Sequence, residues 1–144
     1  MTPRASRRPA WLVAVVLLQG LISTADAPQV PTGTWAPTGG MVSSRTGATA
    51  ALLADGRVLV VAGGEDAEGP SATAELYDGG TQVFSPAAAM GVARARAAAV
   101  ALSDGRVLVT GGLAAGGEAT SAAEAYDPGT DSWSAVGDMA EARA

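Results

Sequence analysis

The feature that most constrains this sequence is an internal repeat with a period of 49 residues. Residues 41–89 align without gaps with residues 90–138, and 19 of the 49 aligned positions are identical. A repeat of this length indicates an array in which each copy is one small structural unit that packs against its neighbours. The two copies make up most of the 144 residues, so they determine the fold.

Each copy predicts four short β-strands. In the first copy, apolar runs at 48–53 and 58–62 flank Asp55-Gly56, and this dipeptide predicts a hairpin with a type I′ turn. Both runs are apolar throughout rather than alternating, so we expect both faces of these strands to be buried. A third strand at 74–77 and a fourth strand that carries Phe84 complete the unit. The second copy repeats this order, which predicts an all-β chain.

Several residue types recur in step with the period and are candidate structural positions. These positions are Arg45 and Arg94, Glu75 and Glu124, Tyr77 and Tyr126, the aromatic set Trp35, Phe84 and Trp133, and the glycine pairs Gly63-Gly64 and Gly111-Gly112. The glycine pairs lie one residue out of register, which predicts a small insertion in one copy. We expect the aromatic side chains to pack within the stack of repeats, with carbohydrate stacking as the alternative. Since Arg suits a buried bidentate contact, the Arg and Glu positions predict a recurrent ion pair, with binding of an anionic ligand by the arginines as the alternative.

The period, the double glycine, the Tyr-Asp pair and the Trp that follows it resemble the kelch-repeat β-propeller family, most clearly in DGRVLVTGG and AEAYDPGTDSW. The resemblance implies a leader with an outer strand of a preceding blade at 26–40, kelch repeats at 41–89 and 90–138, and the start of a third repeat at 139–144. A closed propeller has about 4–8 blades. Two four-stranded blades and a leading strand are therefore incomplete for a closed ring, and we expect the N-terminal fragment of a longer propeller. Further blades or self-association would be needed to close the ring.

The N-terminus predicts export. Three arginines within the first eight residues precede an apolar run at 11–18, and small residues follow. This order is typical of a signal peptide, and the run is short for a membrane-spanning helix, although an uncleaved anchor is the alternative. We expect a signal peptide at 1–25 with cleavage after Ala25. Cleavage after Ala27 is less favourable because Pro28 would follow the cut. The mature protein is then secreted or periplasmic without a stable membrane anchor. The Ala-, Gly- and Arg-rich composition suggests a high-GC genome, and the resemblance is to bacterial, secreted members of the kelch family.

The composition excludes several classes of function. The net charge is −5, and His, Cys and Lys are absent. An acidic chain without a basic surface is not expected to bind nucleic acid, and disulfides, thiolate nucleophiles and zinc sites of imidazole and sulfur are excluded. We therefore predict no catalytic, cofactor-binding or metal-binding residue in this chain. The acidic loop with Glu65, Asp66 and Glu68 is expected to be solvated, with a calcium site as the alternative, and Asp131 and Asp138 are assigned no role.

The predicted function is a binding or scaffold module that engages a protein or a glycan. The alternative is the N-terminal part of a secreted carbohydrate-active kelch enzyme, either a galactose-oxidase-like oxidase or a sugar isomerase; a third reading is a nonfunctional gene fragment. Resemblance to the oxidases implies a copper centre that uses Tyr and His, with a Cys cross-linked to one Tyr. This chain has Tyr77 and Tyr126 but neither His nor Cys, so under that alternative the catalytic groups would lie in other blades.

Overall fold

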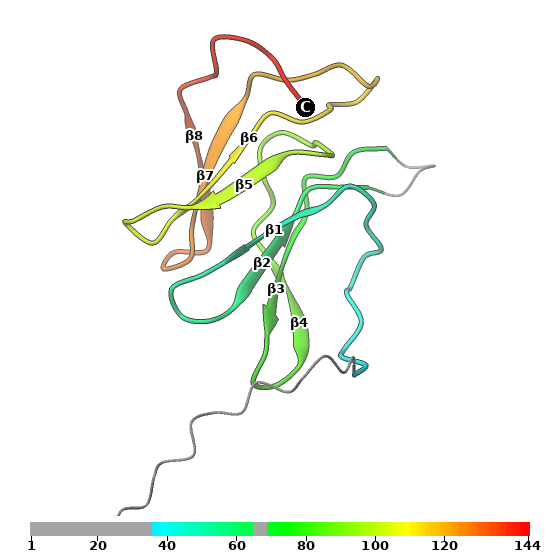
Figure 1. Ribbon diagram of the computed structural model, residues 1–144, viewed down its shortest axis with the longest axis vertical. Coiled ribbons are helices and arrows are strands. Elements are labelled where there is room, and N and C mark those ends of the chain that lie inside the picture. Colours follow the sequence, from blue (N-terminus) through cyan, green and yellow to red (C-terminus); the bar gives the residue numbers. More distant parts are fainter. Residues whose placement is uncertain (1–35, 65–68) are drawn as a thin grey trace, which may run out of the picture. The chain divides into compact units, whose positions relative to one another are not determined.

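The repeat folds as two four-stranded antiparallel sheets, one sheet for each copy (Figure 1). The computed structural model describes residues 36–64 and 69–144. The first sheet contains β1 (Thr49–Leu52), β2 (Val58–Val61), β3 (Ala74–Asp78) and β4 (Val83–Ala87), and the second contains β5 (Ala98–Ala101), β6 (Val107–Thr110), β7 (Ala123–Asp127) and β8 (Ser132–Val136). The strands of each sheet lie in sequence order. The prediction of an all-β kelch-type segment that does not form a closed ring is confirmed.

Every strand of the second sheet begins 49 residues after its counterpart in the first. The expected insertion is therefore wrong. Where β2 and β6 end, the chain needs two successive residues with positive φ, and Ala62 and Gly63 (63° and 80°) match Gly111 and Gly112 (64° and 96°). The glycine pairs looked out of register because Ala62 takes the first of these conformations without being glycine.

The two expected hairpins form, but with a different turn. In the first hairpin, the Gly56 N–H donates to the Leu53 carbonyl oxygen at 3.1 Å, and the Leu53 N–H donates to the Arg57 carbonyl oxygen at 2.8 Å. Gly56 has a φ of 88°, whereas Asp55 does not have a positive φ. This is a three-residue loop, a type I turn followed by a left-handed glycine, rather than the predicted type I′ turn.

The core lies between the two sheets. Ala51, Leu59 and Val61 of the first sheet belong to the same buried cluster as Val107 and Tyr126 of the second. The first strands of the two sheets, β1 and β5, lie side by side (Figure 1). We call each sheet a blade, because it is one repeat packed face to face on the next.

Full burial of both faces is wrong for the first two strands of each blade. In β2, Leu59 and Val61 have no exposed surface, but the intervening Val60 is partly exposed. Leu52 in β1 and Val100 in β5 are 64% and 55% exposed. The physical reason is that, within the described residues, each blade has one neighbouring blade, which covers one of its two faces.

Residues 36–40, the described part of the expected leading strand, form no strand. Gly39 instead donates its N–H to the carbonyl oxygen of Gln82, at the turn between β3 and β4 of the first blade. Trp35, the signal peptide at 1–25 and its cleavage site lie outside the described residues. Within residues 36–64 and 69–144, no helix has the length and apolar character needed to cross a membrane.

Candidate binding surface and the contacts that support it

The recurring charges form one buried ion pair inside each blade. Arg45 lies 2.9 Å from Glu75, and Arg94 lies 2.6 Å from Glu124. The glutamates lie on the third strands, β3 and β7, and the arginines lie just before the first strands. The four side chains are at most 7% exposed. Both expected ion pairs are therefore present.

The guanidinium groups also satisfy backbone carbonyls at the ends of the strands. One Arg94 nitrogen donates to the carbonyl oxygens of Gly111 and Ala122, at 3.3 and 2.6 Å. Arg45 makes the equivalent contacts with Ala62 and Thr73, at 3.1 and 2.9 Å. Because these donors are directed inward and are almost completely buried, the geometry favours a structural role over the capture of an anionic ligand.

The Glu75 carboxylate also holds the segment that enters the first blade. It accepts hydrogen bonds from the backbone N–H groups of Val42 and Ser43, at 2.7 and 3.2 Å. Burial by itself would raise the pKa of Glu75, but the Val42 amide, the Arg45 guanidinium and the Ser43 amide together hold the pKa below its usual value. Glu75 is therefore a charged, fully bonded anchor within the blade.

Arg94 also joins the two blades through its backbone. Its N–H donates to the carbonyl oxygen of Ser71 at 3.1 Å, and its carbonyl oxygen accepts from the N–H of Gly63 at 3.0 Å. Both partners belong to the first blade, while the Arg94 side chain binds Glu124 in the second. One residue therefore connects the two repeats.

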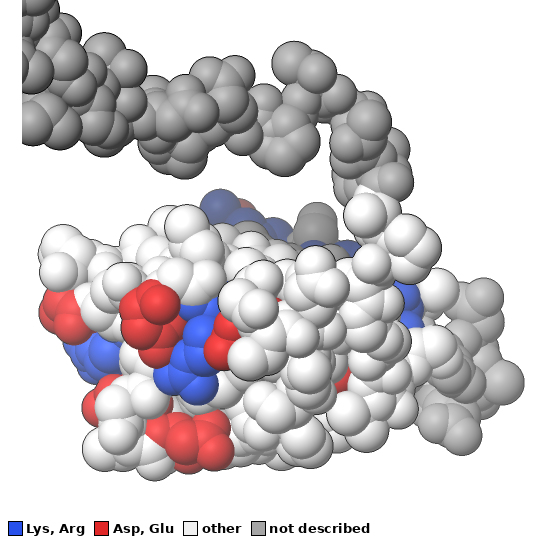
Figure 2. All heavy atoms as spheres, turned by 90° about the horizontal axis from the view of Figure 1, so that it is seen from below, with Lys and Arg blue, Asp and Glu red and all other residues white. Residues whose placement is uncertain are grey.

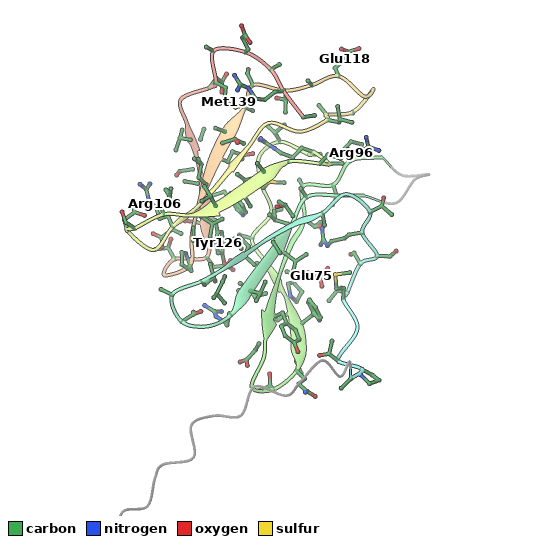
Figure 3. All side chains as sticks on the ribbon, viewed as in Figure 1. Glu75, Arg96, Arg106, Glu118, Tyr126 and Met139 are labelled. Atoms are coloured by element: carbon green, nitrogen blue, oxygen red, sulfur yellow. The ribbon has the colours of Figure 1, made fainter. Side chains whose placement is uncertain are left out.

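The described aromatic residues pack in pairs within each blade. The ring centroids of Tyr77 and Phe84 are 4.7 Å apart, and those of Tyr126 and Trp133 are 5.1 Å apart. The hydroxyl group of Tyr77 is 2.7 Å from Oγ1 of Thr38. Tyr126 lies between the sheets with no exposed surface (Figure 3). These four rings therefore make internal contacts within their own blades.

Asp131, to which the sequence assigned no role, links the two blades. Its Oδ1 atom accepts hydrogen bonds from the Ala88 N–H at 2.9 Å and from the Tyr126 hydroxyl at 2.8 Å, and Trp133 donates to the Ala88 carbonyl at 2.7 Å. The Ala88 and Tyr126 hydrogen bonds lower the pKa of Asp131, while burial and the hydrogen bond to Asp131 raise that of Tyr126. Repeat comparison missed Asp131 because Gln82 occupies its place in the first copy. The sequence signal that could have identified Asp131 is its position five residues after Tyr126, in the turn that follows β7.

A groove of about 330 Å³ opens at the end of the blades that carries the β2–β3 and β6–β7 loops. Its lining includes Gly47, Pro70, Arg96, Leu113 and Ala114. Arg96 is exposed and lies at this end, whereas Arg106 lies at the tip of the β5–β6 hairpin (Figure 3). The groove is therefore formed by loops and by the segments that enter the first strands.

Arg96 has an unusual backbone conformation. Its φ is 56°, and the equivalent residue of the first copy is Gly47, with a φ of 64°. The Arg96 N–H donates to the Gly47 carbonyl oxygen at 2.7 Å, which joins the two equivalent residues across the blades. A non-glycine residue with positive φ is strained, and such residues cluster at functional sites. The sequence signal for Arg96 was an arginine in the place of a glycine.

The acidic loop adjoins this groove along the chain, but Glu65, Asp66 and Glu68 lie outside the described residues. Glu118, the carboxylate in the matching second-copy segment, is exposed. Among the residues that the structure does describe, no three His, Cys, Asp or Glu side chains are grouped so that they could hold a metal ion. The calcium interpretation of the acidic loop therefore stays a prediction.

The hairpin tips carry exposed ion pairs. Asp55 lies 2.7 Å from Arg57, and Asp104 lies 2.7 Å from Arg106. The side-chain hydrogen bond from the arginine lowers the pKa of each aspartate. Figure 2 shows acidic and basic side chains next to one another on the face of the molecule seen there. These pairs compensate charge locally and stabilise the turns.

Comparison with known proteins gives a match to a family model and a similar solved structure. Residues 94–140, which include all four strands of the second blade, match the Kelch motif. No curated protein sequence matches significantly. The solved structure of a fungal alcohol oxidase of the AA5 family, in complex with copper, is similar, with a TM-score of 0.54 and 27% sequence identity. The similarity covers 64% of this chain but only 18% of the oxidase chain.

The similar region therefore makes up less than a fifth of the oxidase chain. The motif match includes both Arg94 and Glu124, and the structure repeats their ion pair in the other blade. The two blades, the repeated ion pair and the motif match together support a kelch-repeat family for this chain.

Proposed function

We propose that this chain is part of an exported binding or scaffold module that engages a protein or a glycan through the groove lined by Arg96. The observation that carries this proposal is a difference in exposure between the recurring residues and Arg96. Arg94, Glu124 and Tyr126 are buried in internal contacts, whereas Arg96 is exposed at a groove formed by loops. Loops placed by a rigid scaffold are the usual carriers of binding residues.

The volume and the lining of the groove suit a small segment of a ligand. Its volume of about 330 Å³ is at the lower end of the range of about 300–1,000 Å³ for ligand pockets. Pro70, Leu113 and Ala114 supply apolar surface, and Arg96 supplies a group of hydrogen-bond donors. Such a surface suits one or two sugar rings or a short stretch of extended peptide.

A groove-filling substitution tests this proposal. Ala114 lines the groove, whereas the adjacent Ala115 is exposed and does not line it. Ligands selected from arrays of oligosaccharides and peptides would be titrated calorimetrically against the unmodified chain, Ala114→Trp and Ala115→Trp. We expect Ala114→Trp to abolish binding and Ala115→Trp to retain it. Equal affinity for all three proteins would contradict binding in the groove.

A carbohydrate-active enzyme is the second candidate, favoured by the similarity to the copper-containing oxidase. The residues of this chain do not fit such a copper centre. His and Cys are absent from the sequence, the buried Tyr126 hydroxyl donates to Asp131, and the Tyr77 hydroxyl is hydrogen-bonded to Thr38. Under this proposal, the catalytic groups belong to blades other than these two.

Copper titration tests whether these two blades themselves belong to a binding module or carry the site of a copper enzyme. We expect no saturable Cu(II) binding by electron paramagnetic resonance, and no hydrogen peroxide production with galactose or simple alcohols. A stoichiometric copper signal accompanied by turnover would favour the enzyme and would count against a purely binding role for these blades.

Export is part of the same proposal and rests on the charged, apolar and small-residue segments of the first 27 residues. We expect mass spectrometry of the exported protein to find cleavage after Ala25. Recovery of the exported protein with Met1 still attached would contradict cleavage and favour an anchored N-terminus.

A further inference from the structure

The groove lined by Arg96 lies between the two blades and is bounded by residues of both. Thr46, Gly47 and Pro70 belong to the first repeat, whereas Arg96 and Leu113 belong to the second. The N–H of Arg96 donates to the carbonyl oxygen of Gly47 at 2.7 Å and joins the two sides of the groove. The walls of the groove are therefore supplied by the two repeats of this chain.

Arg96 carries the only charge among the described residues that line the groove; the others are Gly, Ala, Thr, Pro and Leu. It forms no ion pair with any described residue, although four other arginines each form one, namely Arg45, Arg57, Arg94 and Arg106. A guanidinium group presents five N–H donors in a planar fork that fits both oxygens of one carboxylate. The Arg96 guanidinium can therefore bind an anionic group of a ligand.

The surrounding backbone fixes the first part of the Arg96 side chain. A Cβ atom added at Gly47 would lie 3.2 Å from the Arg96 Cγ atom, so the stem of the arginine packs over this glycine. Arg96 has a φ of 56°, a conformation in which glycine is more stable than a residue with a side chain. Among the described residues, no hydrogen bond or ion pair of its guanidinium offsets this strain. A strained and exposed residue that is held beside a groove is a candidate for ligand binding.

The rest of the lining favours a peptide over a sugar. Pro70, Leu113 and Ala114 supply aliphatic surface beside Arg96. No aromatic ring is among the described residues that line the groove, and the two tyrosines pack against Phe84 and Trp133. Sugar rings are commonly held against flat aromatic faces, whereas aliphatic side chains bind to aliphatic surface through burial. A carboxylate next to an aliphatic side chain is therefore the chemistry that this groove fits best.

The size of the groove selects the end of a peptide chain rather than its middle. Its volume of about 330 Å³ is small for a ligand site. In an extended peptide, neighbouring side chains point to opposite sides, and the next side chain on the same side is about 7 Å further along. An internal acidic residue and its apolar neighbour would therefore not enter such a groove together. The last residue of a chain carries a carboxylate and a side chain on the same Cα atom, so both can enter.

We propose that the groove binds the C-terminus of a partner protein that ends in an aliphatic residue, a ligand class that rests on the binding role proposed above for the groove. The terminal carboxylate lies on the Arg96 guanidinium, and the terminal side chain packs on Pro70, Leu113 and Ala114. Capture of a chain terminus by its carboxylate is a recurring mode of peptide recognition. The charge of Arg96 selects a chain end, and the aliphatic surface selects its last side chain.

Calorimetric titration of the full chain with three short acetylated peptides tests the proposal. The first peptide ends in Ala-Leu with a free carboxylate, the second is its C-terminal amide, and the third is the same amide with glutamate in place of the alanine. We expect the free carboxylate to bind at least about tenfold more tightly than either amide, because only the terminal carboxylate pairs with Arg96 inside the groove.

Two arginine variants locate the contact. Arg96→Gln should reduce the affinity for the free carboxylate to that for its amide. Arg143→Gln is the matched control, because Arg143 is also exposed, forms no ion pair with a described residue and does not line the groove; it should leave the affinity unchanged. Arg96→Gly, which gives the second copy the glycine of the first, should lose the preference for the free carboxylate without lowering the melting temperature. Loss of binding then cannot be attributed to unfolding.

The proposal is overturned if none of the peptides binds, if the free carboxylate and its amide bind equally, or if Arg96→Gln keeps the preference for the carboxylate. The groove-filling variant Ala114→Trp separates these outcomes from failure of the proposed function. If ligands selected from the arrays still fail to bind Ala114→Trp, the groove remains a binding site and only the ligand class assigned here is wrong. If Ala114→Trp binds those ligands and the free carboxylate as the unmodified chain does, the groove itself is not the binding site.

Discussion

Arg94 combines burial, an ion pair and backbone contacts in one side chain. It has no exposed surface, and it binds Glu124 and two carbonyl oxygens. Removing one partner of a buried pair leaves the other charge without compensation in a poorly solvating environment, which typically costs about 3–5 kcal/mol. An exposed pair such as that of Arg106 and Asp104 contributes little, because water screens both charges.

We therefore expect Arg94→Ala to lower the free energy of unfolding by about 3–5 kcal/mol, and Arg106→Ala to lower it much less. Urea unfolding followed by circular dichroism would measure both values. Equal effects of the two substitutions would show that burial does not distinguish the two kinds of ion pair in this fold.

Glu75 makes stability depend on acid pH. Its pKa is lowered in the folded protein, so the unfolded chain binds the proton more readily. The stabilisation is complete above the ordinary pKa of 4.5 and is lost as the pH falls through the lower folded value. We expect Glu75→Gln to reduce stability at pH 7 and to make the loss of stability at acid pH shallower. Thermal unfolding across the acid range measures both effects, and Glu118→Gln controls for the loss of one exposed charge.

At the scale of the element, the bend after the second strand of each blade leaves no room for a side chain at its second positive-φ residue. Gly112 has a φ of 96°, and a Cβ atom there would lie 2.5 Å from the Ala95 carbonyl oxygen. Gly116 has a similar φ of 93°, but a Cβ atom there would have no neighbour within 4 Å. The two positions therefore separate backbone strain from steric overlap.

We expect Gly116→Ala to cost about 1–2 kcal/mol from the left-handed backbone alone. Gly112→Ala should cost about 1–3 kcal/mol more, because the methyl group displaces packed backbone. Chemical unfolding of both variants gives the difference. Equal costs would mean that the Ala95 segment moves away without penalty.

At the scale of the whole molecule, the two blades share one core and should unfold together. Leu59 belongs to the first blade but packs in the same cluster as Val107 and Tyr126 of the second. Its truncation removes buried surface at the contact between the blades and leaves a cavity, which typically costs about 2–5 kcal/mol. Leu52, in the same blade, is 64% exposed.

We expect Leu59→Ala to accelerate amide hydrogen exchange in β6 as much as in β2, measured by mass spectrometry, because loss of the shared core opens both sheets. Leu52→Ala should leave both exchange rates nearly unchanged. Faster exchange confined to β2 would show that the blades unfold independently.

The position of every strand was predictable from the sequence, because the period of 49 residues and the apolar runs recur together. The Arg–Glu pairs were predictable for the same reason, since two oppositely charged residues that keep a constant separation in both copies indicate a contact. The local sequence pattern did not predict the type of turn at Asp55-Gly56 correctly. The same dipeptide occurs in two-residue and three-residue loops, and the pairing of Leu53 with Arg57 selected the longer loop.

Repeat comparison could not find features that occur in only one copy. Asp131 and Arg96 replace Gln82 and Gly47, so neither residue belongs to the recurring pattern, although one bridges the blades and the other lines the groove. The sequence by itself determined the repeat, its strands and its buried ion pairs, because local patterning and spacing carry that information. Only the tertiary structure decided which face of each blade is covered and where the groove opens, because burial depends on how one blade packs against the next.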